Sequence, residues 1–198
     1  MEAKMRDEIK TKRLILRPIG NRDAQNISTL AGDIEIARMT GAIPYPYPVI
    51  SAEFFIMTNR ENRRRGLCYN YAVTLRDNDQ LMGVVGVFRR GENAAFELGY
   101  WLGKPYWNHG YTTEACAAIL REAQNHLGVS HIAAGVFVDN PASMKVLKKL
   151  GFKSLETYGT WFSLARMERV KGLNLTLDFD AFDTKLSLQD SQKNAMRA

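Results

Sequence analysis

The segment most able to bind an anion lies where a predicted strand passes into a predicted helix. It reads Trp107-Asn108-His109-Gly110-Tyr111-Thr112-Thr113, and the helix is expected over residues 112–127. Such a turn aims several backbone N–H groups at one spot, with the positive end of the helix dipole behind them. A phosphate could bind there, with His109 beside it. One glycine and two threonines also suit an ordinary helix start, so both interpretations stay open, and the Walker and Rossmann glycine patterns are absent from this segment.

An acidic side chain stands on the strand that precedes this segment. Over residues 94–102 the side chains alternate between two faces, and Glu97 shares its face with Gly99 and Trp101. A glycine weakens a strand unless a bulge is needed or something approaches the backbone closely. Glu97 is therefore a candidate acid or base beside an approachable strand, although a solvent-facing glutamate fits the pattern equally well.

A mixed sheet domain of the α/β (α+β) class must position these residues. Hydrophobic patterning predicts strands over 13–18, 68–76, 81–90, 94–102, 131–138, 152–158 and 173–179. It predicts helices near 23–31, 33–39, 51–65, 112–127 and 140–150. A meander followed by alternating strands and helices excludes a doubly wound sheet. Residues 13–183 are expected to form one domain, between flexible, polar and poorly patterned tails over 1–12 and 184–198.

Proline and capping residues mark two of these boundaries. Pro44-Tyr45-Pro46-Tyr47-Pro48 can be neither helix interior nor central strand, so it is expected to be an extended loop that exposes Tyr45 and Tyr47. Ser51 is expected to cap the helix that follows. Asn140 is the predicted N-cap of the clearest helix, with proline at its first position and glycine after its end.

Composition narrows the class of protein. The chain has 198 residues, 45% of them hydrophobic and 24% charged, which excludes a mainly disordered chain and a collagen. No run approaches the roughly 20 apolar residues that span a bilayer, and the charged start carries no secretory signal, so a cytoplasmic protein without a membrane partner is expected. Two cysteines and three histidines show no metal-ligand spacing, so no metal is expected.

The net charge of +6 favours an anionic partner. Such a partner could be a phosphate-bearing cofactor, an acidic protein or a nucleic acid. Direct nucleic-acid binding is not expected, because no basic stripe is interleaved with aromatic residues.

Three motifs in order carry a resemblance to a known family. FELGYWL, PYWNHGYTTEA and VFVDNPASMKVLKKLGF resemble the GNAT superfamily of acetyl-CoA-dependent N-acetyltransferases. TKRLILRP and PYPYPVISAEFFI resemble, more narrowly, its RimJ/RimL-type branch of ribosomal-protein-alanine N-acetyltransferases. The resemblance extends from about Thr11 to Phe182. It is specific for the fold and the cofactor, and much less specific for the acceptor.

The resemblance implies a twisted, mostly antiparallel sheet of about six or seven strands with about four helices. The strands at 94–102 and 131–138 would be parallel and splayed, with acetyl-CoA between them. Asn108 replaces a glycine of the family's phosphate loop, His109 a basic residue and Thr112 an alanine; asparagine tolerates a left-handed backbone better than most residues. The implied cofactor-binding residues are Leu98, Tyr100, Trp101, Leu102, Trp107, Asn108, His109, Gly110, Tyr111, Thr112, Thr113, Asn140 and Ser143.

The resemblance also implies catalytic roles. Many members use a tyrosine as the acid for the leaving thiolate, but Leu147 stands at that position here. The branch has a serine after its asparagine, and Ser143 matches it. Glu97 would then be the base, acting through water. Tyr45, Tyr47, Phe162 and Arg166 would border the acceptor.

Three functions remain open at this stage. An N-terminal α-amine, with a pKa of about 7.7–8.0, is neutral far more often at pH 7 than a lysine side chain at about 10.4. One indirect carboxylate base therefore suits a protein N-terminus, such as that of a ribosomal protein. A small amine acceptor (polyamine, amino acid or aminoglycoside) and a CoA-binding module without turnover are the alternatives, and a monomer and a homodimer are equally compatible.

Overall fold

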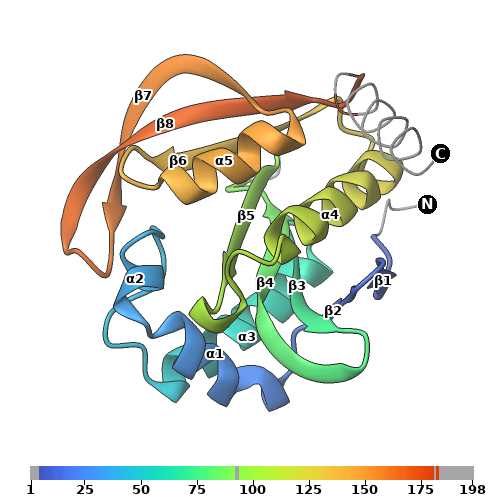
Figure 1. The fold of residues 1–198 in the computed structure, drawn as a ribbon, viewed down its shortest axis with the longest axis vertical. Coiled ribbons are helices and arrows are strands. Elements are labelled where there is room, and N and C mark those ends of the chain that lie inside the picture. The colour runs from blue at the N-terminus through green and yellow to red at the C-terminus, as the bar shows by residue number, and fades with distance from the viewer. Residues whose placement is uncertain (1–4, 92–93, 181, 183–198) are drawn as a thin grey trace.

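The computed structural model describes residues 5–91, 94–180 and 182, which build one twisted sheet flanked by helices (Figure 1). Within them, eight strands follow the order β1-β2-β3-β4-β5-β6-β8-β7. Every neighbouring pair is antiparallel except β5 and β6. The strands are β1 (Ile9–Lys10), β2 (Leu14–Pro18), β3 (Cys68–Leu75), β4 (Asn78–Phe88), β5 (Glu97–Leu102), β6 (His131–Phe137), β7 (Lys153–Ser163) and β8 (Glu168–Asp178).

Five α-helices in the described residues agree with the five helical stretches that patterning predicts, one more than the resemblance implies. They are α1 (Ala24–Ala31), α2 (Ile34–Ala37), α3 (Val49–Arg64), α4 (Tyr111–Leu127) and α5 (Pro141–Leu150). The cap of α5 is as predicted, because the Asn140 side chain accepts a hydrogen bond from the Ser143 N–H. The cap of α3 is not, because that helix begins at Val49 with Pro48 as its N-cap, so Ser51 lies inside the first turn. None of these helices is long and apolar enough to cross a membrane.

Two apolar cores lie on opposite faces of the sheet. Side chains at alternate strand positions, such as Val85 and Leu98, join α4 and α5 in the first core. The intervening positions, such as Val84, join α1 and α3 in the second core. Because neighbouring strand residues point to opposite faces, β5 contributes Leu98 and Tyr100 to one core and Trp101 to the other. The sheet is therefore covered on both faces around β5.

The N-terminal segment corrects one boundary. Residues 5–12, which we expected to be a flexible tail, lie against the domain. Met5 is buried, and Arg6 donates three hydrogen bonds to the fully buried Glu122 carboxylate through its N, Nε and Nη2 atoms at 2.8, 2.8 and 2.6 Å. Ile9–Lys10 then pairs with β2. It forms the eighth strand of the sheet, where hydrophobic patterning predicts seven. A two-residue strand is too short for hydrophobic alternation to reveal. The expected tail at 184–198 lies outside the described residues.

The long β7–β8 hairpin curves over the end of the molecule away from α1 and α3, and its tip approaches α2 (orange to red in Figure 1). β7 runs five residues past its predicted end and β8 begins five residues before its predicted start. Most of β7 is exposed, so its pattern lacks the apolar alternation that reveals a half-buried strand. The hairpin tip is held to the loop after α2 by Leu164 N–H, which donates to the Gly41 carbonyl at 3.2 Å.

Candidate active site

The two parallel strands at the centre of the sheet separate after a single pairing. Glu97 of β5 is opposite Ala133 of β6, and the Ala133 N–H donates to the Phe96 carbonyl at 2.9 Å. Beyond that point the structure gives no further β5–β6 pair among the described residues. The strands thus splay toward their C-terminal ends, as the resemblance implies.

The splay exposes backbone groups of β5. The Phe96 carbonyl points toward β6, whereas the Gly103 N–H points the other way and donates to Met82 of β4 at 2.8 Å. Because backbone groups alternate along a strand, those of Leu98, Tyr100 and Leu102 point into the splay. Part of this edge is already used, since the Leu102 carbonyl accepts a hydrogen bond from Trp107 Nε1 at 2.6 Å. The remaining groups form an edge with which a ligand amide can pair.

The turn over residues 107–113, which the sequence offers as a candidate anion site, lies at the open end of the splay. Asn108 and Gly110 both adopt the left-handed backbone, with φ of 64° and 77°, which confirms that Asn108 tolerates this conformation. Gly110 is the N-cap of α4. The N–H groups of the first helical residues, Thr112 and Thr113 among them, have no acceptor within the helix. They line the cleft together with Asn108 and Gly110.

Arg13, the residue just before β2, holds this turn. Its Nη1 donates to the His109 carbonyl at 2.9 Å, and its Nε donates to Glu114 Oε2 at 2.7 Å. Burial raises the pKa of the Glu114 carboxyl, but hydrogen bonds from Thr11 and Arg13 outweigh it and lower the pKa overall. The carboxylate therefore stays ionised and fixes the start of α4 against β2.

His109 and Tyr111 do not line the cleft in the described structure. Their rings stack on each other with centroids 5.5 Å apart, and the Arg13 guanidinium lies 4.6 Å from the Tyr111 ring centroid. His109 Nδ1 is 2.7 Å from the Trp107 carbonyl. Both rings support the turn from its outer side, so a cofactor contact by either remains a prediction.

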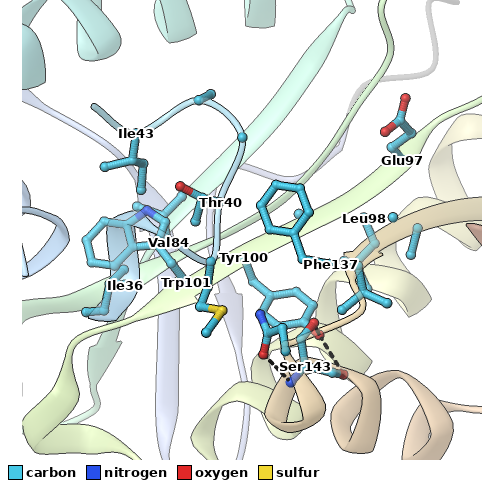
Figure 2. Close-up of a pocket in the computed structure, with 18 of the residues that line it drawn as sticks. Ile36, Thr40, Ile43, Val84, Glu97, Leu98, Tyr100, Trp101, Phe137 and Ser143 are labelled. Carbon is cyan, nitrogen blue, oxygen red and sulfur yellow. Dashed lines mark hydrogen bonds between the residues drawn. The ribbon is translucent and has the colours of Figure 1, made fainter. Parts of the chain in front are cut away.

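Ser143 reaches the splay from the first turn of α5. Its hydroxyl is 2.9 Å from the hydroxyl of Tyr100, which also donates to the Ser143 carbonyl at 3.3 Å (dashed in Figure 2). Burial raises the pKa of Tyr100 well above its ordinary range. Tyr100 therefore stays protonated, and Ser143 and Asn140 stand at the cleft wall that faces the open β5 edge.

Glu97 stands apart from this pair. It lies at the paired end of the splay, and its carboxylate points away from Tyr100 and Ser143 (Figure 2). Arg90 Nε is 3.3 Å from its Oε1, and the Glu97 side chain is 30% exposed. Glu97 precedes Tyr100 by three residues on the opposite face of β5, or about 10 Å along the strand. The structure therefore does not bring the two predicted catalytic residues into contact.

The splay opens into a cleft of about 2130 Å³ that passes between α3, the loop after α2 and the β7–β8 hairpin. The cleft thus has two arms, the splay itself and this part beyond it, and apolar residues dominate the second arm. Ile50 and Phe54 of α3 are 68% and 65% exposed and stand along it. Phe137 rises between the Thr40–Ile43 loop and the Ser143 end of α5 (Figure 2). The arm offers a surface to an apolar or peptide-like molecule that approaches the splay.

Sequence reasoning missed one wall of the second arm, which is formed by Trp161. The Trp161 indole of β7 lies across three glycines of adjacent strands, Gly159, Gly172 and Gly135. A Cβ added to Gly172 would be 1.7 Å from Trp161 Cζ3, so only glycine leaves room for the ring. The Phe137 ring is 6.2 Å from the indole. A tryptophan in a strand gives no signal by itself, and the pairing that sets Gly159 opposite Gly172, with Gly135 two residues from the partner of Gly172 on β6, is visible only in the assembled sheet.

The predicted acceptor residues separate into two groups. Phe162 and Tyr47 line the cleft, although Tyr47 is only partly exposed, contrary to our expectation, and burial raises its pKa to about 12. Tyr45 is exposed but does not line the cleft in the described structure. Arg166 does not line it either, because its guanidinium bonds Asp139 at 2.8 and 3.1 Å. Arg166 thus serves the fold in the structure, and the sequence pattern could not show its partner.

Comparisons with known proteins agree with this architecture. The chain matches the Acetyltransferase (GNAT) domain family over residues 13–153. It belongs to the GNAT acetyltransferase family. The N-acetyltransferase YoaA of Bacillus subtilis (strain 168) is 30% identical over 148 residues, which cover 73% of this chain and 82% of YoaA. This GNAT chain is thus an N-acetyltransferase.

Two solved structures share the GNAT fold of this chain. The Mycobacterium smegmatis RimJ in complex with CoA-disulfide has a TM-score of 0.76 at 19% identity, covering 89% of each chain. A RimL ribosomal L7/L12 α-N-protein acetyltransferase in complex with coenzyme A has a TM-score of 0.77 at 17% identity, covering 88% of this chain and 99% of that one.

Basic side chains outnumber acidic side chains among the residues that line the GNAT cleft. Its described lining residues include two acidic side chains, Glu35 and Glu97, which pair with Lys104 and Arg90 respectively. The basic lining residues are Arg38, Arg89, Arg90, Lys145, Lys149 and Arg169. No cluster of three or more histidine, cysteine or acidic side chains among the described residues could hold a metal ion. The cleft therefore favours an anionic or neutral ligand over a polycation.

Proposed function

We propose that this GNAT enzyme transfers the acetyl group of acetyl-CoA directly to the N-terminal α-amine of a protein. One observation carries the proposal: an open strand edge, the turn at the start of α4 and a serine hydroxyl line the same cleft. The RimJ and RimL likenesses in fold agree with a protein acceptor.

The donor arm of the site fits an elongated thioester that ends in phosphates. The backbone of Leu98, Tyr100 and Leu102 lies along one side, available for amide pairing. The N–H groups at the start of α4 take the phosphates, since unsatisfied helix N–H groups and the helix dipole both favour an anion there. Lys145 and Lys149 of α5 add positive charge at the cleft wall. The donor is thereby held with its reactive end beside Ser143.

Ser143 acts on the sulfur as the C–S bond breaks. A thiol has a pKa of about 8.5, so the departing sulfur carries negative charge at neutral pH. A serine hydroxyl is a much weaker acid than a thiol, so Ser143 donates a hydrogen bond to the thiolate and keeps its proton. Hydrogen bonds to charged groups contribute about 1.5–3 kcal/mol. That contribution is present only once charge has developed on sulfur, so it accelerates the chemical step.

Glu97 acts on the amine. The amine must be neutral to attack the thioester carbon, and it then loses one proton as the amide forms. Because Glu97 stands about 10 Å along β5 from Tyr100, this proton reaches its carboxylate through water. The proton is later released to solvent, and the thiolate gains one, so the net reaction converts amine and thioester into amide and thiol.

The cleft also supports the choice of acceptor. Polyamines and aminoglycosides carry several positive charges, and the basic cleft would repel them. An N-terminal α-amine has a pKa of about 7.7–8.0 and needs little help to become neutral. The apolar arm formed by Ile50, Phe54 and Trp161 can hold the first side chains of a peptide behind the reacting amine.

An acceptor panel tests the proposal. CoA release from acetyl-CoA would be measured with peptides that have a free N-terminus, the same peptides with a blocked N-terminus and one lysine, spermidine, and an aminoglycoside. We expect turnover with free N-termini and loss of most of it in Glu97→Gln. Turnover confined to lysine side chains or to spermidine would refute the protein N-terminal acceptor, and acetyl-CoA binding without turnover on any acceptor would favour a binding module.

A further inference from the structure

The Tyr100 hydroxyl lies within hydrogen-bond distance of the Ser143 hydroxyl. The two oxygens are 2.9 Å apart, and the Tyr100 ring belongs to the partly buried residues packed on the first core. Ser143 itself is fixed by helix capping, since its N–H donates to Asn140 Oδ1 at 3.0 Å. Two rigid elements, β5 and α5, therefore determine the geometry of the hydroxyl pair, which lies inside the cleft.

The proton of each hydroxyl decides what Ser143 can do. A hydroxyl has one proton to donate and two lone pairs to accept. If the Ser143 hydroxyl donates to Tyr100, the serine proton is engaged in that hydrogen bond, and only a serine lone pair faces the sulfur. The single Tyr100 proton has two acceptors within reach, the Ser143 carbonyl at 3.3 Å and Ser143 Oγ at 2.9 Å. If it goes to the nearer Oγ, the serine proton is free to point at the sulfur. Negative charge on the sulfur favours the second arrangement, and hydrogen bonds in such a chain strengthen one another.

We propose that Tyr100 is the positioning residue of the leaving-group step: its hydroxyl donates to Ser143 Oγ and thereby turns the serine proton toward the departing thiolate. This role belongs to the Tyr100 hydroxyl and adds to any pairing by its backbone. It rests on the proposed function, in which Ser143 stabilises the thiolate. No proton leaves Tyr100 in this step, so the balance of the acetyl transfer is unchanged.

Tyr100→Phe tests the proposal because it removes the hydroxyl and keeps the ring. We expect kcat to fall roughly 3- to 10-fold, the effect of losing one neutral hydrogen bond. The KM for acetyl-CoA should stay within twofold, and CoA binding by calorimetry should be unchanged. Tyr106→Phe is the matched control, since Tyr106 packs on the same core and should leave kcat unaltered. Thermal unfolding of each variant shows that the fold persists.

A double-mutant cycle separates positioning from mere packing. In a Ser143→Ala background, Tyr100→Phe should cost no further activity, because the group that it positions is gone. Equal losses from Tyr100→Phe with and without Ser143 would overturn the proposal, as would an unchanged kcat in Tyr100→Phe. If Ser143→Ala alone kept full activity, the serine role in the proposed function would fail first, and the cycle would report that separately.

Discussion

A methyl group at position 172 should disturb the acceptor arm, which is the apolar arm formed by Ile50, Phe54 and Trp161, while sparing the donor arm. In Gly172→Ala the new Cβ would be 1.7, 2.3 and 2.7 Å from three carbons of the Trp161 ring. Carbon atoms in contact settle at about 3.5–4.0 Å, so the indole must retreat by about 2 Å. A Cβ added at Gly159 or at Gly135 would also lie close to the ring, at 3.3 and 3.1 Å respectively, so the indole sits directly over these glycines. The ring already lies against the sheet over these glycines, so we expect the displacement to carry it outward into the cleft.

The cost of this overpacking is about 1–3 kcal/mol. For a chain of this size that corresponds to a fall in Tm of about 2–12 °C. The displaced indole also occupies the acceptor arm, and loss of 1–2 kcal/mol of acceptor contact raises the acceptor KM roughly 5- to 30-fold. The KM for acetyl-CoA should not change, because the ring lies against Gly135, Gly159, Gly172 and Phe137, none of which belongs to the proposed donor arm.

Calorimetric melting and steady-state kinetics with a peptide acceptor would measure both effects. Gly20→Ala is the matched control, since a Cβ there meets nothing within 4 Å. Adding Trp161→Phe to Gly172→Ala should recover part of the lost Tm, because a smaller ring relieves the clash. A Gly172→Ala protein with the wild-type Tm and the wild-type acceptor KM would show that the ring neither clashes with the new methyl group nor borders the acceptor.

Two further predictions concern the N-terminal segment and the anion-binding turn. Arg6→Ala removes the two guanidinium hydrogen bonds of the buried Glu122 carboxylate but keeps the one from the backbone N–H of residue 6, and it should cost roughly 1–3 kcal/mol in urea unfolding at pH 7. Burial opposes ionisation of Glu122, but the Arg6 hydrogen bonds outweigh it and lower its folded pKa below the ordinary 4.5. This stabilisation is therefore complete above pH 4.5 and is lost as pH falls through the folded pKa, so the penalty of Arg6→Ala should shrink in acid; a pH-independent penalty would contradict the linkage. Gly110→Ala forces a side chain into φ of 77° at a cost of about 1–2 kcal/mol and should raise the KM for acetyl-CoA several-fold, whereas an unchanged value would show that the turn does not bind the donor.

The local signals along the chain predicted the elements that build the donor arm. Capping fixed the start of α5 at Asn140, and Asn108 takes the left-handed backbone that its residue type allows. The splay between β5 and β6 was expected from the resemblance and not from the residues. Patterning ended β7 at Tyr158 and thereby cut the hairpin short of Trp161.

Long-range partners were beyond the reach of local reasoning. Arg166 was expected beside the acceptor because of its place in the chain, but it is held by Asp139. Arg6 was assigned to a flexible tail because nothing near it in sequence indicates a partner, whereas Glu122 lies 116 residues away. The hydroxyl contact between Tyr100 and Ser143 likewise depends on how α5 docks on β5. Such contacts form only after the sheet has assembled.

Ser143 is proposed to stabilise the leaving thiolate of a bound acetyl donor, and Ser143→Ala removes the hydroxyl that would do so. Single-turnover rates of acetyl transfer to a free N-terminal peptide would be compared for the wild type, Ser143→Ala and the control Ser154→Ala on exposed β7. Loss of a charge-assisted hydrogen bond predicts a rate about 10- to 100-fold lower, with acetyl-CoA affinity unchanged and Ser154→Ala at the wild-type rate. A Ser143→Ala rate equal to that of the wild type would contradict the account.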